Sequence, residues 1–278
     1  MNKMKNLLVI VALGLVVMAV FVQPSRSNEL AENKDVAEDK VVITEDNLTV
    51  KAPTAYDPNK FEEVGISWPK VSGLKDSQAL KKLENTLSLK SIFGNIFDHE
   101  ESLDDLRKLI SEGNSGIVSI GFDVNYNQHS LLDINFWMET MGAYPNTVVV
   151  HRIINLKTGE PLKTAKVFNE SMLNKLLAKV IKLKEAEEKE TIKDLEPEVD
   201  KEDILDRLQR TKYDLKDLKN FEVSNKGVTF LYDYEFPHVI RALQPNGRYF
   251  ISFEELESFI NPNGPLEIFL KKPSSPLD

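Results

Sequence analysis

The stretch VSIGFDVNYNQHSLLDINFWM, residues 118–138, decides the fold class. In its first half, apolar side chains at Val118, Ile120, Phe122, Val124 and Tyr126 alternate with small or polar ones. A period of two is typical of a strand with one face in a core and the other toward water. A turn is predicted at 127–129, and the alternation resumes from residue 132 to residue 138.

The chain on either side of this stretch carries signals of the same kinds. A strand predicted over 148–156 follows the short loop 142–146, so three consecutive strands form an antiparallel meander. Further strands are predicted at 63–71, 221–224, 228–234 and 248–252, and a turn at 225–227 makes a C-terminal hairpin. Capping residues predict helices that begin near Asp76 or Ser77, Ser102, Asn169 and Ser252. The expected fold class is α+β, an antiparallel sheet (meander plus C-terminal hairpin) with helices packed on one face.

The N-terminal end of the chain is typical of an exported protein. Residues 1–6 carry two lysines, residues 7–22 form an unbroken apolar run, and Pro24 precedes small residues at a possible cleavage position. This pattern predicts a signal peptide or N-terminal membrane anchor over 1–27. The rest of the chain is therefore expected outside the cytoplasm, in the periplasm, at the cell surface or secreted, with the membrane touched only through the N-terminal segment.

Composition divides the remainder into three parts. The acidic residues 28–60 predict a flexible tether, with at most one short strand at 41–44. The folded α+β domain is expected over 61–260, and 261–278 is expected to be a Pro-rich irregular tail. Residues 184–203 are nearly all charged, which predicts either a solvated helix end or a flexible excursion.

The charge and the absence of cysteine exclude several classes of function. The formal net charge is −9, and removal of residues 1–27 would take away three basic residues and lower it to −12. Such a charge argues against a nucleic-acid partner and favours encounter with a basic protein. Because the chain has no cysteine, disulfides, thiol catalysis and cysteine-bound zinc are excluded.

The sequence contains no motif that supports an enzyme. The four histidines form no metal-binding spacing, and neither a nucleophile elbow nor a phosphate-binding glycine loop occurs. The segment from Asp123 resembles the start of a calcium loop, but Gln128 and Ile134 occupy positions that need Gly and Glu. We therefore predict no catalytic residue, no metal and no cofactor.

Aromatic residues on or beside the predicted sheet are the candidate binding residues. Such rings can stack on sugars or anchor a protein partner, and they can equally serve as core or cross-strand packing. The loop after the second meander strand is expected to be the most exposed part. The predicted ligand-binding residues are Trp137, Gly142, Ala143, Tyr144, Pro145, Tyr232 and Tyr234.

Five short segments, taken in order, resemble one family of extracytoplasmic domains. They are Ile66–Pro69 with Gly73, Met141–Pro145, Ile154–Leu162 with Phe168, Phe221–Glu235, and Ile251–Leu256. Together they span most of 61–260 and resemble the domain shared by lysozyme-sensing anti-sigma factors of the RsiV type and the non-catalytic N-terminal region of PdaC-type peptidoglycan deacetylases. The loop departs from the family pattern, because Tyr144 stands where a histidine is common.

The resemblance and the export signal together predict a function. With six residues before the apolar run and Asp278 at the end, neither a sigma-binding domain nor a deacetylase domain is expected. The chain is then a non-catalytic binding module of the bacterial cell envelope, whose partner is peptidoglycan or a basic, wall-acting protein such as lysozyme. Two alternatives stay open, a structural or assembly factor of an envelope complex and an unrecognised hydrolase.

Overall fold

The computed structural model describes residues 40–54, 57–94, 102–113, 116–197 and 199–270. The predicted signal segment 1–27, the predicted tether up to residue 39 and the tail from residue 271 lie outside these ranges. Within them, no helix is both long enough and apolar enough to cross a membrane.

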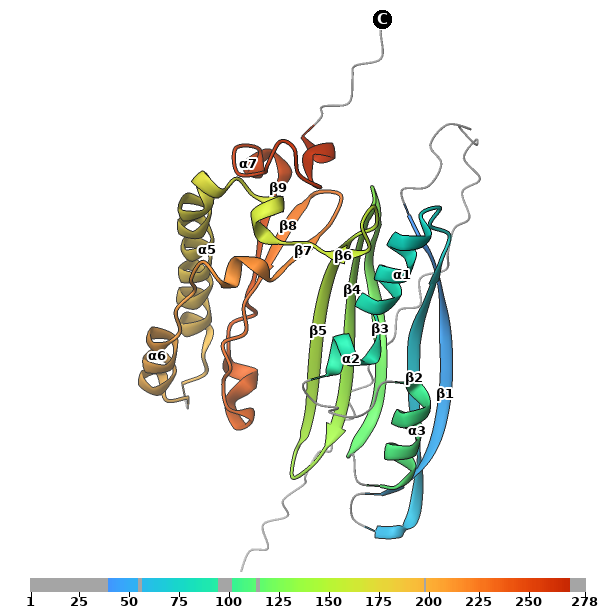
Figure 1. Cartoon of the computed structure of the whole chain (residues 1–278). Helices are drawn as coiled ribbons and strands as arrows, with labels where there is room; N and C mark the ends of the chain where they lie inside the picture. The colour runs from blue at the N-terminus through green and yellow to red at the C-terminus, as the bar shows by residue number, and fades with distance from the viewer. Residues whose placement is uncertain (1–39, 55–56, 95–101, 114–115, 198, 271–278) are drawn as a thin grey trace, which may run out of the picture. The chain divides into compact units, whose positions relative to one another are not determined.

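The described strands form two separate sheets (Figure 1). The six strands of the large sheet lie in chain order, and they are β1 (Val42–Thr54), β2 (Asp57–Ser72), β3 (Ile117–Gln128), β4 (Leu131–Met141), β5 (Pro145–Asn155) and β6 (Glu160–Pro161). The small sheet comprises β7 (Phe221–Val223), β8 (Gly227–Leu231) and β9 (Arg248–Ser252). Neighbouring strands are antiparallel except β2 and β3, which are parallel. The α+β class is therefore confirmed.

Two parts of the predicted organisation need correction. Residues 42–54, expected within the flexible tether, form β1 and pair along their length with β2. Val50 and Ala52 of this strand are buried in the core, which explains why an otherwise polar segment is ordered. The C-terminal hairpin does not extend the meander, because β7 and β8 pair with β9 in a sheet of their own.

The meander is confirmed, with two local differences. The β3–β4 turn lies at His129 and Ser130, two residues beyond the expected start, and both have positive φ (54° and 58°) as a tight hairpin turn requires. A register shift between Val124 and Tyr126 interrupts the alternation of β3. Tyr126 consequently turns to the other face and is buried in the second core, whereas Val124, before the shift, is 41% exposed.

Three helices cover one face of the large sheet (Figure 1), as expected. They are α1 (Ser77–Thr86), α2 (Leu89–Phe93) and α3 (Leu103–Ser111). Asp76 caps α1, and Ser102 with Asp105 forms the predicted capping box of α3. Leu83, Phe93 and Ile110 from these helices pack against Phe136 and neighbouring apolar side chains of the sheet.

A second core lies between the small sheet and the helices of the C-terminal half. The helices of this half are α4 (Thr164–Val167), η1 (Glu170–Met172), α5 (Leu173–Asp194), α6 (Lys201–Arg210), η2 (Asp217–Lys219), η3 (His238–Leu243), α7 (Phe253–Leu256) and η4 (Glu267–Phe269). Of these, α6 and η3 pack instead in a small third cluster around Tyr234 and Phe236. Phe168, Phe221 and Phe230 meet at its centre, with ring centroids 5.5 to 6.1 Å apart. Of the two readings of the charged segment 184–203, the helix end is correct up to Asp194.

One buried carboxylate joins the large sheet to the small one. Asp133 on β4 has no exposed surface, and its Oδ1 accepts hydrogen bonds from His151 Nε2 (2.8 Å) and Asn125 Nδ2 (3.0 Å). Its Oδ2 accepts from the backbone N–H of Val223 on β7 (2.8 Å). These bonds fix how the two sheets meet, and they place His151 in a structural network.

Candidate functional site

The predicted loop is exposed at the end of the meander. It joins β4 to β5, and Gly142, Ala143, Tyr144 and Pro145 are all exposed, Tyr144 by 65%. The Tyr144 ring stacks on His238 of η3, with centroids 5.4 Å apart and planes 27° apart. Two segments that are distant in the chain, the loop and η3, therefore contribute one ring each to a stacked pair.

Trp137 is only half-buried, but its ring is held by a close contact. It lies on the face of β4 opposite to its neighbours Phe136 and Met138, which point into the first core. A Cβ atom added at Gly121 on β3 would lie 2.3 Å from the Trp137 ring, so the indole packs directly on the glycine backbone. Trp137 contributes a fixed apolar surface on this face of the sheet.

Tyr232 and Tyr234 do not belong to this surface. Tyr234 is 3% exposed and its hydroxyl is hydrogen-bonded to that of Tyr249 (2.8 Å), and burial raises the pKa of both. Tyr232 is half-buried and meets Tyr234 edge to face, and the Lys184 Nζ atom lies 5.5 and 5.1 Å from the two ring centroids. Both rings pack beside Lys184 of α5, so for the buried Tyr234 the structure favours the alternative of core packing, and a binding role for Tyr232 stays a prediction.

Strand β5 has a free edge over much of its length. Among the residues that the structure describes, its outer side pairs only with β6, at Ile154 and Asn155, and the Leu162 N–H donates to Ile153 O (2.8 Å). Backbone groups of alternate residues in a strand point to the same side, so those of Thr147, Val149 and His151 also point outward. Arg152 Nη1 donates to His151 O (2.9 Å), which leaves Thr147 and Val149 as the open positions.

This edge lacks the features that usually protect an edge strand. Residues 146–150 carry no charge, and Val149 is 60% exposed. Natural edges are commonly blocked by charged side chains, bulges or covering elements, because open backbone groups pair readily with another strand. Only Pro145, at the start of β5, has this protective character. We call the edge at Thr147–Val149, the loop Gly142–Pro145 and His238 together the docking surface.

The chain segment that carries the loop and the open edge is acidic or neutral. Glu139 lies opposite Thr147 across the ladder, is exposed, and accepts a hydrogen bond from the Ser119 hydroxyl (2.7 Å). From Glu139 to His151 the sequence contains no lysine or arginine. The loop and the open part of the edge therefore carry no fixed positive charge, and the arginines of the elements concerned are Arg152, further along β5, and Arg241 on η3.

Sequence reasoning missed His238 and the β5 edge. The sequence does show an uncharged run at Thr147–Val150, which is the signal that could have been used. That run is equally typical of a strand with partners on both sides, so the open edge depends on where β6 ends.

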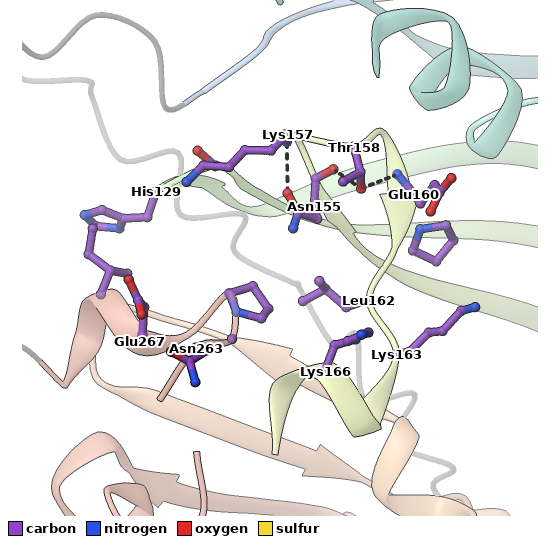
Figure 2. Close-up of a pocket in the computed structure, with 15 residues that line it drawn as sticks. His129, Asn155, Lys157, Thr158, Glu160, Leu162, Lys163, Lys166, Asn263 and Glu267 are labelled. Atoms are coloured by element: carbon purple, nitrogen blue, oxygen red, sulfur yellow. Dashed lines mark hydrogen bonds between the residues drawn. The ribbon is translucent and has the colours of Figure 1, made fainter. Parts of the chain in front are cut away.

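The described residues offer little to a metal or to catalysis. Within the described ranges, no group of three or more His, Asp or Glu residues is placed to hold a metal ion. A cavity of about 660 Å³ lies at the opposite end of β5 and contains none of the predicted binding residues (Figure 2).

Comparisons with known proteins support the fold and nothing more specific. No protein-family model and no curated protein matches the chain. The chain is similar to a solved structure of a DUF3298 family member from Bacteroides fragilis, with 16% identity, a TM-score of 0.51, and coverage of 83% of this chain and 97% of that one. It is also similar to a DUF3298 family protein from Pseudomonas aeruginosa, with 11% identity, a TM-score of 0.54, and coverage of 80% and 94%. The more specific resemblance to the RsiV and PdaC domains stays a prediction.

Proposed function

We propose that this chain is an exported, non-catalytic binding module of the cell envelope that docks a basic, wall-acting protein such as a lysozyme. The observation that carries the proposal is the open, uncharged β5 edge beside the exposed Tyr144–His238 ring pair. An open edge offers backbone hydrogen bonds to a strand of a partner, and an adjacent aromatic ring supplies an anchor. Both features suit a protein partner better than a free sugar chain.

Charge supports a basic partner. The chain carries 44 acidic and 35 basic residues, and the segment from Glu139 to His151, which includes Tyr144, contains no lysine or arginine. Opposite charge raises the rate of encounter between two proteins and contributes less to the strength of the final complex. Long-range attraction would bring the partner close, and the edge and the rings would hold it.

Calorimetric titration of the full chain with a c-type lysozyme tests the proposal. We expect micromolar or tighter binding that Tyr144→Ala weakens at least tenfold, because the ring anchor is lost. Phe61→Ala is the matched control, since Phe61 on β2 is 64% exposed and lies outside the docking surface. The control should bind as the unchanged chain does.

Two results would overturn the proposal. If binding disappears steeply with salt and Tyr144→Ala has no effect, the two proteins attract each other only through net charge. If no binding is found, lysozyme is not the partner, and peptidoglycan fragments and envelope complexes become the next candidates.

A further inference from the structure

A cavity lies near the β5–β6 turn, at the end of β5 away from the docking surface. The cavity of about 660 Å³ is bounded by the β3–β4 turn, the segment from Asn155 through β6 into α4, and the C-terminal loop 263–268 (Figure 2). Its volume is in the range of sites that bind small molecules, roughly 300–1,000 Å³. The docking surface at the other end of β5 shares no residue with it.

The lining of this cavity is basic, although the whole chain is acidic. Lys157, Lys163 and Lys166 line it, and Figure 2 shows Lys157 on one side and the other two on the opposite side. Among the described residues, none of the three forms an ion pair within 4.0 Å. We call the space between these lysines the basic pocket.

The carboxylates of the lining do not cancel this charge. Glu160 is paired with Lys82 of α1, with 2.6 Å between Oε1 and Nζ, and this contact is the main cause that lowers the pKa of Glu160, to which the charge of Lys163 adds a smaller contribution. Glu267 is the second carboxylate. The lining thus contains three lysines and two carboxylates, and one carboxylate, Glu160, forms an ion pair with Lys82 from outside the pocket.

The backbone beside Lys157 and Lys166 is held by contacts with neighbouring segments. Asn155 Oδ1 accepts from the Lys157 N–H (2.9 Å), and a Cβ at Gly159 would lie 2.1 Å from Ala79 O, so this turn packs tightly on α1. Lys166 O accepts from Asn261 Nδ2 (3.3 Å), which ties α4 to the C-terminal loop. The amines extend from anchored positions, so a ligand need order only the side chains.

We propose that the basic pocket binds a small organic anion with two or more carboxylate or phosphate groups. Amines on opposite sides of the opening can each meet one negative group, and a monoanion would leave one side unpaired. Because the net charge of −9 repels anions in general, this pocket is the place where a multivalent anion gains contacts that offset the repulsion. The proposal is independent of the docking surface and of its partner.

Titration of the full chain with citrate and with inorganic pyrophosphate tests this site. The site variant replaces Lys157, Lys163 and Lys166 with Gln, and the control replaces the exposed Lys175, Lys182 and Lys189 of α5 with Gln. Both variants change the net charge equally. We expect at least one probe to bind the unchanged chain and the control alike, and the site variant to bind it at least tenfold more weakly.

A second readout separates lost binding from lost folding. The probe should raise the unfolding temperature of the unchanged chain and of the control, and not that of the site variant. The stronger of the two probes would identify carboxylate or phosphate as the preferred group, and Tyr144→Ala should not change either titration. Equal weakening in both lysine variants, or no binding of either probe at millimolar concentration, would overturn the proposal.

Discussion

At the scale of single residues, Asp133 has the most consequences for the fold. A carboxylate with no exposed surface is costly unless every oxygen is hydrogen-bonded, and here three donors from β3, β5 and β7 supply those bonds. The carboxylate therefore acts as a connection between sheets that share few other polar contacts.

Asp133→Asn should lower the free energy of unfolding by about 2–3 kcal/mol. The amide keeps one acceptor oxygen and replaces the other by an NH₂ group, which must face one of the existing donors. Urea unfolding measures the change, and Asp123→Asn on the exposed part of β3 is the control, with an expected change below about 0.5 kcal/mol. Equal effects of the two substitutions would mean that the bonds of Asp133 contribute nothing specific.

At the scale of elements, β5 combines a paired side and an open side. The backbone groups of Ile153 point outward, since its carbonyl accepts from Leu162, and the direction alternates from residue to residue along the strand. The Val148 N–H therefore points toward β4 and the Val149 N–H toward the free edge. The N–H of Val148 therefore donates within the sheet, whereas the N–H of Val149 is open to a partner. This difference can be tested with proline, which has no N–H.

Val148→Pro should lower the free energy of unfolding by about 3 kcal/mol or more, since it breaks a bond inside the sheet. Val149→Pro should cost at least about 2 kcal/mol less, because proline is tolerated where the N–H faces outward on an edge. Urea unfolding of both variants makes the comparison. Equal costs would contradict the open edge, and in the lysozyme titration Val149→Pro should weaken binding without loss of the fold.

At the scale of the whole molecule, buried tyrosines link stability to high pH. Burial raises the pKa of Tyr213, Tyr234 and Tyr249 in the folded chain, whereas in the unfolded chain each titrates near about 10. Above that pH the unfolded chain releases these protons and the folded chain keeps them. The unfolded state then binds fewer protons, so the free energy of unfolding falls as pH rises.

We therefore expect stability to be insensitive to these tyrosines below about pH 9 and to fall above about pH 10, by up to about 1.4 kcal/mol per pH unit for each. Urea unfolding between pH 8 and about 11 measures the slope, and Tyr249→Phe should reduce it. Tyr144→Phe removes an exposed phenol and is the control. An unchanged slope in Tyr249→Phe would contradict this explanation.

Local pattern was sufficient for much of the fold. The strands within 118–138, the capping boxes at Ser102 and Ser252 and the hairpin turn near Asn225 each depend on neighbouring residues. The structure contains all of them, with the alternation of β3 interrupted only between Val124 and Tyr126. The exposed loop Gly142–Pro145 could also be predicted, since a glycine and a proline flank an aromatic residue between two strands.

Other features depend on contacts between distant segments. The ordering of β1, the burial of Tyr234 and the stacking of Tyr144 on His238 each require a partner that no local pattern specifies. The sequence by itself determined the class of the fold, the acidic charge and the position of the exposed loop, because these follow from short-range periodicity and composition. Only the tertiary structure decided that β5 has an open edge and that three lysines gather in one pocket, because strand pairing and turn packing bring together residues that are far apart in the chain.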